Sequence, residues 1–182
     1  MPPLETSRLL LRPLTLDDAP EIQRLFPQWE IVRFLANIVP WPYPPDGALR
    51  FVRDVALPAI ASGQSWNWTL RLKSDPDRLI GAIQLTKREH ESRAFWIAPP
   101  YQGRGLMSEA VDAVTDFWFD VLKMPVLRVE KAAANLASRR ISEKQGMRLV
   151  GTVERDYVSG RQLAEIWEIT AEEWRARRRS AK

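Results

Sequence analysis

Three consecutive segments of the chain have the short apolar-rich pattern that is typical of strands. They span Ser65–Leu72, Leu79–Leu85 and Arg93–Ala98. The turn residues Asp75-Pro76-Asp77 separate the first two segments, and the polar run Lys87–Ser92 separates the last two. Because such short connections join neighbouring antiparallel strands, the pattern predicts an antiparallel meander over this region.

Beyond residue 105 the apolar positions repeat with the period of a helix. They are Met107, Ala110, Val111, Val114, Phe117, Trp118 and Val121. Pro125 ends this helix, and Val126–Val129 is the next predicted strand. A strand-helix-strand unit is expected to place Val126–Val129 parallel to Arg93–Ala98.

The N-terminal third of the chain predicts one strand and two helices. Leu9–Arg12 is a strand that ends at Pro13, and Thr15 or Asp17 caps a short helix toward Phe26. The proline-rich residues 40–45 form a stiff loop, because proline fixes φ and removes a donor. Asp46 then caps a helix that runs to about Ala61.

The C-terminal part of the chain adds two helices and two strands. A helix over Ser138–Gln145 stops at Gly146, and strands follow at about Leu149–Glu154 and Ala164–Ile169. Residues 170–173 read TAEE, a capping box that opens the last helix. The expected fold class is α+β, with a mixed, mostly antiparallel sheet of about six to seven strands flanked by helices.

Composition limits the classes of protein that this chain can belong to. A length of 182 residues suits a single domain over 1–182. The absence of cysteine excludes thiol catalysis and disulfides, and a single histidine, His90, makes a histidine-rich metal site untenable, so no metal is expected. No apolar run approaches the roughly 18 residues of a membrane span. We therefore expect a cytoplasmic protein with no membrane partner.

The positive net charge of +4 comes from the C-terminus. Of the 27 Lys and Arg residues, five lie in the basic tail at residues 175–182, which leaves 22 against 23 acidic residues before it. Such a tail can contact RNA or the ribosome, or it can simply complement the C-terminus of its own helix. Both interpretations stay open.

The candidate chemistry lies at residues 95–110, which read FWIAPPYQGRGLMSEA. A strand, a glycine-rich loop and a helix N-terminus together form an anion site, because the first N–H groups of a helix have no partner. The spacing fits neither the Walker loop nor the Rossmann fingerprint, since Ser108 stands where the third Rossmann glycine would be. A sharp turn without a ligand is the alternative.

The same residues resemble the acetyl-CoA loop of the GNAT superfamily of N-acetyltransferases. Gln102, Gly105 and Met107 fill the positions of its motif Gln/Arg-x-x-Gly-x-Gly/Ala, although Met107 departs from the small last residue. The opening ETSRLLLRPL at residues 5–14, NLAS at 135–138 and EKQGM at 143–147 resemble the branch of ribosomal-protein N-terminal alanine and serine acetyltransferases.

This resemblance implies a GNAT-like sheet whose parallel strand pair splays apart at the site of acetyl-CoA, the expected co-substrate. The first strand of the pair would leave backbone groups near Ile97 free for the pantetheine arm, and the loop would bind the pyrophosphate. The implied cofactor-binding residues are Ile97, Ala98, Gln102, Gly103, Arg104, Gly105, Leu106, Met107, Asn135 and Ser138. For Arg104, a solvated loop arginine is the alternative.

Transfer of an acetyl group to an amine needs a base, an oxyanion donor and an acid for the leaving thiolate. By resemblance, an N–H near Ile97 is the oxyanion donor. Ser142 stands where many GNAT enzymes have an acid tyrosine, and the resembled branch instead suggests Ser138, three residues after Asn135. Ser138 is also a natural N-cap for its helix.

The sequence does not single out one residue as the general base. Related sequences often carry a glutamate where this chain has Ser92, so neighbouring Glu91 is the catalytic candidate, with Glu89, His90 and Asp156 as alternatives. Each of these is equally well explained as a solvated hairpin residue.

The acceptor is expected to be a protein N-terminal α-amine or a small amine. An α-amine has a pKa near 7.7–8.0 and needs less help to lose its proton than a lysine ε-amine near 10.4. Trp41 and Tyr43, on the proline-rich loop, are the candidate substrate-binding residues. The alternatives are an inactive acyl-CoA-binding module and a ribosome- or RNA-associated protein that acts through its basic tail. A homodimer is possible by resemblance.

Overall fold

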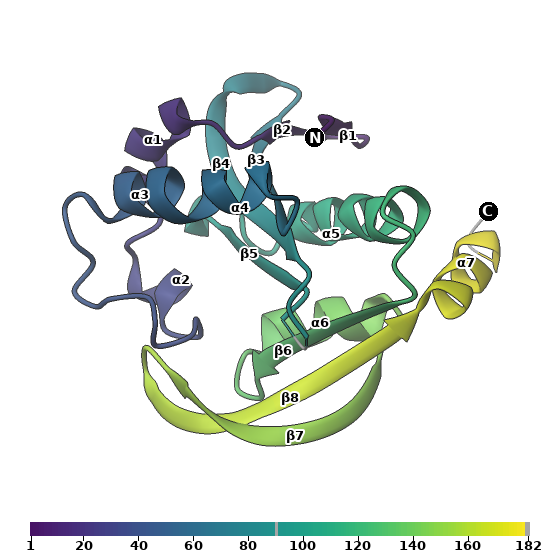
Figure 1. The fold of residues 1–182 in the computed structure, drawn as a ribbon. Coiled ribbons are helices and arrows are strands. Elements are labelled where there is room, and N and C mark those ends of the chain that lie inside the picture. The colour runs from purple at the N-terminus through teal and green to yellow at the C-terminus, as the bar shows by residue number, and fades with distance from the viewer. Residues whose placement is uncertain (90, 181–182) are drawn as a thin grey trace.

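The computed structural model describes residues 1–89 and 91–180, and its first half forms a five-stranded antiparallel sheet (Figure 1). The strand order is β1-β2-β3-β4-β5, so each strand pairs with its neighbour in the chain. The strands are β1 (Leu4–Glu5), β2 (Leu9–Pro13), β3 (Ser65–Leu72), β4 (Asp75–Thr86) and β5 (Arg93–Ile97). The predicted meander is confirmed.

The turn between β3 and β4 lies earlier than the sequence predicts. Leu72 pairs with Asp75, which leaves Lys73 and Ser74 as the turn and brings the predicted turn residues into β4. Pro76 is accommodated because the register shifts on both sides of Arg71, and proline is tolerated in strands at such irregularities.

The C-terminal half forms a second antiparallel sheet in the order β6-β8-β7. Its strands are β6 (Val126–Ala132), β7 (Arg148–Tyr157) and β8 (Gly160–Thr170). β7 and β8 form the long curved hairpin of Figure 1, and both exceed their predicted lengths. With five and three strands, the described residues hold one strand more than the upper expectation.

The two sheets meet where β5 begins. The Ser92 N–H donates to the Arg128 carbonyl at 2.9 Å, and an isolated antiparallel bridge joins Glu91 to Val129. Among the described residues no ladder joins β5 to β6, so the two strands of the expected splayed pair share no hydrogen-bonded register. The two strands separate beyond this contact (Figure 1), because β5 pairs with β4 and β6 pairs with β8.

Seven α-helical segments flank the described sheets: α1 (Ala19–Leu25), α2 (Trp29–Val32), α3 (Gly47–Arg50), α4 (Leu57–Ala61), α5 (Leu106–Asp116), α6 (Leu136–Lys144) and α7 (Ala171–Ser180). A π-helical turn, Phe51–Ala56, joins α3 to α4, and a second one, Phe117–Val121, extends α5. The first interrupts the helix predicted from Asp46 to Ala61 just before Pro58, which has no N–H for a regular helical bond.

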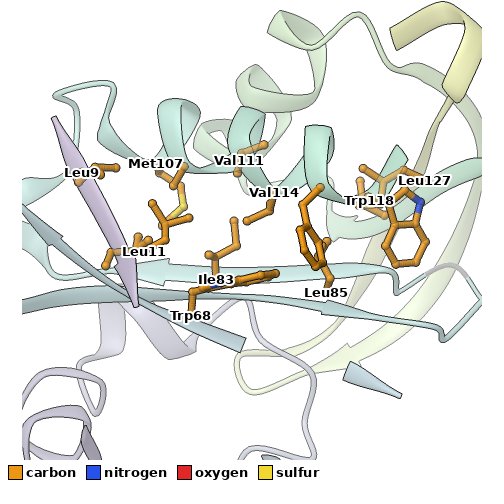
Figure 2. Close-up of a cluster of buried hydrophobic side chains, with 14 of the residues drawn as sticks. Leu9, Leu11, Trp68, Ile83, Leu85, Met107, Val111, Val114, Trp118 and Leu127 are labelled. Carbon is orange, nitrogen blue, oxygen red and sulfur yellow. The ribbon is translucent and has the colours of Figure 1, made fainter. Parts of the chain in front are cut away.

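The main core lies between the five-stranded sheet and α5. Figure 2 shows Leu11, Trp68 and Ile83 of the sheet beneath Met107 and Val114 of α5, and all of them are buried. Leu127, Val129 and Trp167 of the second sheet join the same core. A second apolar cluster, around Ile22 and Val52, covers the opposite face of the first sheet with α1 and the helices after the proline-rich loop.

The last helix is held against the rest of the protein by its own arginines. The capping box predicted at its start is confirmed, since Glu173 accepts from Thr170 N at 2.8 Å and Thr170 Oγ1 accepts from Glu173 N at 3.2 Å. Arg175 pairs with Asp120 at 3.3 Å, and Arg178 pairs with Asp116 at 2.7 Å. Much of the basic tail therefore complements its own chain.

Over residues 1–89 and 91–180, no helix is both long enough and apolar enough to cross a bilayer. In the same ranges, no cluster of three or more His, Asp or Glu side chains is arranged to hold a metal ion.

Candidate active site

The glycine loop has the backbone geometry of an anion site. After β5, a short 3₁₀ turn (Pro99–Tyr101) leads to Gly103 with φ +70° and to Gly105 with φ +74°, which is the N-cap of α5. Residues with a side chain rarely adopt these positive φ values, so the two glycines allow the turn. Its shape directs the N-terminus of α5 toward the space beside β5.

The first turn of α5 presents backbone donors that the helix itself does not use. The Glu109 N–H donates to the Gly105 carbonyl at 3.1 Å, which is the first bond of the helix. The N–H groups of Leu106, Met107 and Ser108 precede this bond and have no intrahelical acceptor. Together with the helix dipole, they favour a negatively charged group at this position.

The N-terminal segment of the chain braces this loop from behind. Glu109 accepts hydrogen bonds from Thr6 Oγ1, from Arg8 N at 2.8 Å and from Arg8 Nε at 2.8 Å. Arg8 also donates to the Arg104 carbonyl at 3.1 Å. Burial acts to raise the pKa of the Glu109 carboxyl, but these hydrogen bonds outweigh it, so the pKa is lowered. The sequence analysis did not single out Arg8 or Glu109 for this role.

The strand before the loop has one free backbone edge. The Ala98 N–H donates to the Ile80 carbonyl at 2.9 Å, so Ala98 faces β4. Because adjacent residues of a strand direct their backbone groups to opposite sides, the N–H and C=O of Ile97 point away from β4, toward the gap beside β6. Gln102 Nε2 donates to this C=O at 3.0 Å. No partner of the Ile97 N–H occurs among the described residues.

Asn135 and Ser138 lie at the start of α6, but their local roles differ from the prediction. Asn135 is the N-cap, and its Oδ1 accepts from the Ser138 N–H at 3.2 Å. The helix therefore begins at Leu136, and the expectation that Ser138 caps it is wrong. Ser138 is 9% exposed, and no hydrogen bond between described residues involves its hydroxyl. That hydroxyl is available for another partner.

Directly beneath α6 lies a lysine that the sequence analysis missed. Lys131 of β6 is 6% exposed, and its Nζ donates to Ser142 Oγ and, at 3.4 Å, to the Ser138 carbonyl. Burial lowers the pKa of the Lys131 ammonium to about 7. A lysine within the strand before a predicted cofactor motif was the only sequence signal for it.

Two of the candidate bases, Glu89 and Glu91, are carboxylates in the segment just before β5. Glu91 lies 3.7 Å from Arg88, Glu89 lies 3.7 Å from Arg128, and both side chains are at least half exposed. Six residues of extended chain separate Glu91 from Ile97, a distance of about 20 Å. Glu91 therefore cannot reach an atom bound at the Ile97 N–H without intervening water. His90 lies outside the described residues.

Asp156, the remaining candidate base, lies near the turn of the β7–β8 hairpin. Its carbonyl accepts from the Asn37 N–H at 3.1 Å, so the loop after α2 is fastened to it. The neighbouring Tyr157 is 7% exposed, and its hydroxyl is buried with no hydrogen-bond partner among the described residues.

Of the two aromatic residues expected at the acceptor site, Trp41 is exposed and Tyr43 is partly buried. Trp41 is 44% exposed and its ring lies 5.7 Å from that of Trp29, which is 43% exposed. Tyr43 instead packs against Phe26, with ring centroids 5.2 Å apart, and belongs to the second apolar cluster. Burial raises the pKa of the Tyr43 hydroxyl. Tyr43 therefore helps to hold its loop against the end of α1, and its role at the acceptor site stays a prediction.

Comparison with known proteins decides the family of this chain. Residues 8–148 match the family model described as an acetyltransferase (GNAT) domain. The chain belongs to the GNAT acetyltransferase family. The family that the loop and the motif at residues 135–147 predict is thereby confirmed.

One curated GNAT relative and two solved structures illustrate the similarity. The uncharacterized N-acetyltransferase YnaD of Bacillus subtilis (strain 168) is 30% identical over 105 residues, which are 55% of this chain and 62% of YnaD. The chain thus matches about three-fifths of the length of that relative.

The two structures share the GNAT fold at low sequence identity. The ribosomal-protein-S5-alanine acetyltransferase from Vibrio fischeri has a TM-score of 0.80 and 14% identity, over 96% of this chain and 99% of that chain. The spermidine N-acetyltransferase from Vibrio cholerae, solved with CoA and spermine, has a TM-score of 0.76 and 20% identity, over 92% and 98%.

The residues of this GNAT chain fit a coenzyme A group on their own geometry. The open N–H groups of residues 106–108 suit a pyrophosphate, and the unpartnered Ile97 N–H suits an amide or thioester carbonyl. The Gln102 side chain ties the loop to the Ile97 carbonyl, and the Gln102 N–H donates to the Pro99 carbonyl at 3.1 Å, so both donors of Gln102 already have partners. Arg104 is exposed, and its guanidinium lies 5.9 Å from the ring centroid of Tyr101.

Proposed function

We propose that this protein is an acetyl-CoA-dependent N-acetyltransferase that moves an acetyl group to a primary amine by direct attack, through a tetrahedral intermediate. The observation that carries the proposal is the presence of two backbone sites at the two ends of one loop. Open N–H groups begin α5, and a free N–H at Ile97 faces the gap between β5 and β6. One serves the phosphate end of a long cofactor, and the other serves its reacting end.

The family membership and the fold support this assignment of roles. Bound acetyl-CoA would supply an activated acetyl thioester. The N–H groups of residues 106–108 would hold its pyrophosphate, and the Ile97 N–H would donate to the oxyanion as the amine attacks. Asn135 and Ser138 would flank the pantetheine arm at the start of α6, where the Ser138 hydroxyl has no other partner among the described residues.

The proposed acceptor is a protein N-terminal α-amine, with a small amine as the second candidate. The α-amine is favoured because its pKa near 7.7–8.0 leaves a sizeable neutral fraction at neutral pH without a strong base. This matches a site whose candidate base Glu91 can act only through water. The fold relatives include enzymes for both classes, a ribosomal-protein acetyltransferase and a spermidine acetyltransferase.

Trp41 is the proposed contact for the acceptor. The loop that carries it is fastened to the β7–β8 hairpin by the Asn37–Asp156 hydrogen bond at 3.1 Å, and its exposed ring stands beside Trp29. A half-exposed aromatic pair offers an apolar surface for a side chain next to the reacting amine.

Calorimetric titration with acetyl-CoA tests the cofactor assignment, with ATP and NAD as controls. Selective micromolar binding of acetyl-CoA supports the proposal. Absence of binding to folded protein that is free of copurified CoA contradicts it. An inactive acyl-CoA-binding module would bind acetyl-CoA but transfer nothing, so turnover with any amine eliminates that alternative.

An amine screen tests the acceptor. N-terminal peptides that begin with alanine or serine are compared with spermidine and with a peptide whose only free amine is a lysine ε-amine. We expect the highest kcat/KM with the α-amines, and Trp41→Ala should raise KM for them while kcat stays close to wild type. Preference for spermidine would assign the site to small amines instead.

A further inference from the structure

Lys131 combines deep burial with the absence of a paired carboxylate. Its ammonium contacts Ser142 Oγ and the Ser138 carbonyl, and it lies 5.8 Å from the ring centroid of Trp167. No carboxylate of the described residues forms an ion pair with it. Buried lysines are costly unless paired, so this position calls for a reason beyond packing.

The two oxygens that hold Lys131 both belong to α6, four residues apart. Ser138 is a proposed cofactor residue, and Ser142 is completely buried beneath the same helix. Ser142 also stands seven residues after Asn135, where an acid side chain was sought in the sequence and a serine was found. Under α6, the Lys131 ammonium thus meets the hydroxyl of this serine.

The location of Lys131 links the two sheets. It lies on β6, whose edge beyond Arg128 is not paired with β5, and it faces α6. Arg93 of β5 lies close enough to act on it electrostatically from the other strand. The contact with the Ser138 carbonyl at 3.4 Å places the ammonium beside a proposed cofactor residue.

We infer that Lys131, held in place by Ser142, is the acid that protonates the sulfur of coenzyme A as it leaves. The inference rests on the proposed function, and it assigns to a lysine a role for which the sequence suggested Ser138. In the step, the bond between the acetyl carbon and sulfur breaks and its electron pair stays on sulfur. A proton passes from Lys131 Nζ to that sulfur, which gives the free thiol and a neutral amine, and solvent then returns a proton to Lys131.

The charged surroundings of Lys131 favour this proton transfer. Burial and Arg93 lower the pKa of Lys131 to about 7, while Glu165 of β8 and Glu143 of α6 act in the opposite direction. Arg139 of α6 forms ion pairs with both carboxylates, at 2.9 Å from Glu143 and 3.2 Å from Glu165. A thiol such as that of cysteine has a pKa near 8.5, so transfer from an acid near 7 to a thiolate is downhill.

The absence of cysteine from the chain allows a direct test of proximity. Lys131→Cys introduces the only thiol, and the protein is incubated with the disulfide form of coenzyme A and analysed by intact mass spectrometry. The matched control is Ser74→Cys, which places a thiol in the exposed β3–β4 turn. We expect a single coenzyme A adduct at residue 131 that forms at least tenfold faster than the adduct at residue 74, and that excess acetyl-CoA suppresses.

Kinetic measurements distinguish a role of Lys131 as an acid from a purely structural role. Lys131→Met should lower kcat by about 10²-fold or more and change KM for acetyl-CoA less than threefold. In the wild type, kcat should fall as the pH rises through the pKa of Lys131, and this alkaline decrease should be absent in Lys131→Met. Ser142→Ala should keep the decrease but shift its midpoint, because it removes a hydrogen-bond acceptor of the ammonium.

The outcomes distinguish failure of this inference from failure of the proposed function. If acetyl-CoA binds the wild type but residue 131 reacts no faster than residue 74, or Lys131→Met keeps its kcat, the inference is overturned and the function stands. If acetyl-CoA does not bind the wild type at all, both are overturned. Should Lys131→Cys fail to fold, Ser142→Cys, whose side chain meets Lys131 Nζ, takes its place in the labelling experiment under the same criteria.

Discussion

Two buried cations dominate the chemistry of this protein at the scale of single residues. The Lys131 ammonium hydrogen-bonds to two oxygens of α6, and Arg93 is buried between β5 and the helices. Arg93 donates to Thr115 at 3.1 Å and to Gln145 at 2.7 Å, but its Nε has no partner among the described residues. Burial lowers the pKa of Arg93 to about 10, with Asp112 acting against it. Both cations make the folded state sensitive to proton binding.

Lys131 predicts a specific pH dependence of stability. Its pKa is about 7 in the folded protein, below the ordinary lysine value of 10.5, so the unfolded chain binds more protons between these limits. The free energy of unfolding should therefore rise with pH from about 7 toward 10. Lys131→Met lacks this contribution, so its stability relative to the wild type should be greatest below pH 7 and should decline above it.

Urea denaturation of both proteins at pH 6, 7.5 and 9 measures this difference. Equal changes of stability with pH in the two proteins would mean that Lys131 keeps an ordinary pKa in the folded state.

Gly105 predicts an effect on cofactor binding that a matched glycine should lack. Gly105→Val places a β-branched side chain at φ +74° beside Arg8, which distorts the loop and should weaken acetyl-CoA binding at least tenfold. Gly63→Val imposes similar strain at φ +66° after α4, away from the loop. Calorimetry on both folded variants makes the comparison, and an unchanged affinity in Gly105→Val would refute the loop assignment.

At the scale of elements, the start of α6 has one residue that stabilises the helix and another whose hydroxyl is available for the cofactor. Asn135 provides the cap through its Oδ1, whereas the Ser138 hydroxyl contributes no hydrogen bond among the described residues. The two residues are three apart on one helix, and the same substitution, to alanine, is available at each. The pair therefore distinguishes loss of a cap from loss of a catalytic or cofactor contact.

Asn135→Ala should lower the free energy of unfolding by about 1 kcal/mol, the usual value for a lost cap. Ser138→Ala should leave stability within a few tenths of a kcal/mol of the wild type but lower turnover. Thermal unfolding and steady-state kinetics on both variants provide the test. Intact turnover in Ser138→Ala would remove Ser138 from the mechanism, and a stability loss equal to that of Asn135→Ala would show that it supports the helix.

At the scale of the whole molecule, the C-terminal helix closes the structure. α7 follows β8 and returns to the surface of α5, where Trp174 is buried and donates to Asp116 at 2.8 Å. Arg177 donates to the Lys144 carbonyl at the end of α6, so it satisfies a group that the helix leaves open. The basic tail thus joins α5 and α6, the two helices on which the proposed cofactor site rests.

Two adjacent arginines test whether the tail acts through packing or through charge. Arg178 pairs with Asp116 and lies 5.6 Å from the ring centroid of Trp174, whereas Arg179 forms no ion pair within the described part of the chain. Arg178→Gln should lower the free energy of unfolding by about 0.5–1 kcal/mol, and Arg179→Gln should not. Salt-sensitive RNA binding that both substitutions weaken equally would instead support a nucleic-acid role.

The sequence by itself determined those features that depend on neighbours along the chain. The meander over residues 65–97, the apolar face of α5 and the capping box at Thr170 follow from local period and local hydrogen bonding, and each is found in the structure. The glycine loop was predictable for the same reason, because Gly103 and Gly105 adopt the positive φ values that glycine tolerates better than other residues.

Only the tertiary structure decided which residues meet. Lys131 and Ser142 are eleven residues apart, and Arg8 and Glu109 are separated by 101, so no local pattern connects them. The separation of β5 from β6 has the same origin, because β6 pairs with β8, whose partner residues lie 32 to 44 positions further along the chain. Contacts between distant segments depend on how the sheets and helices pack, and packing is a property of the whole chain.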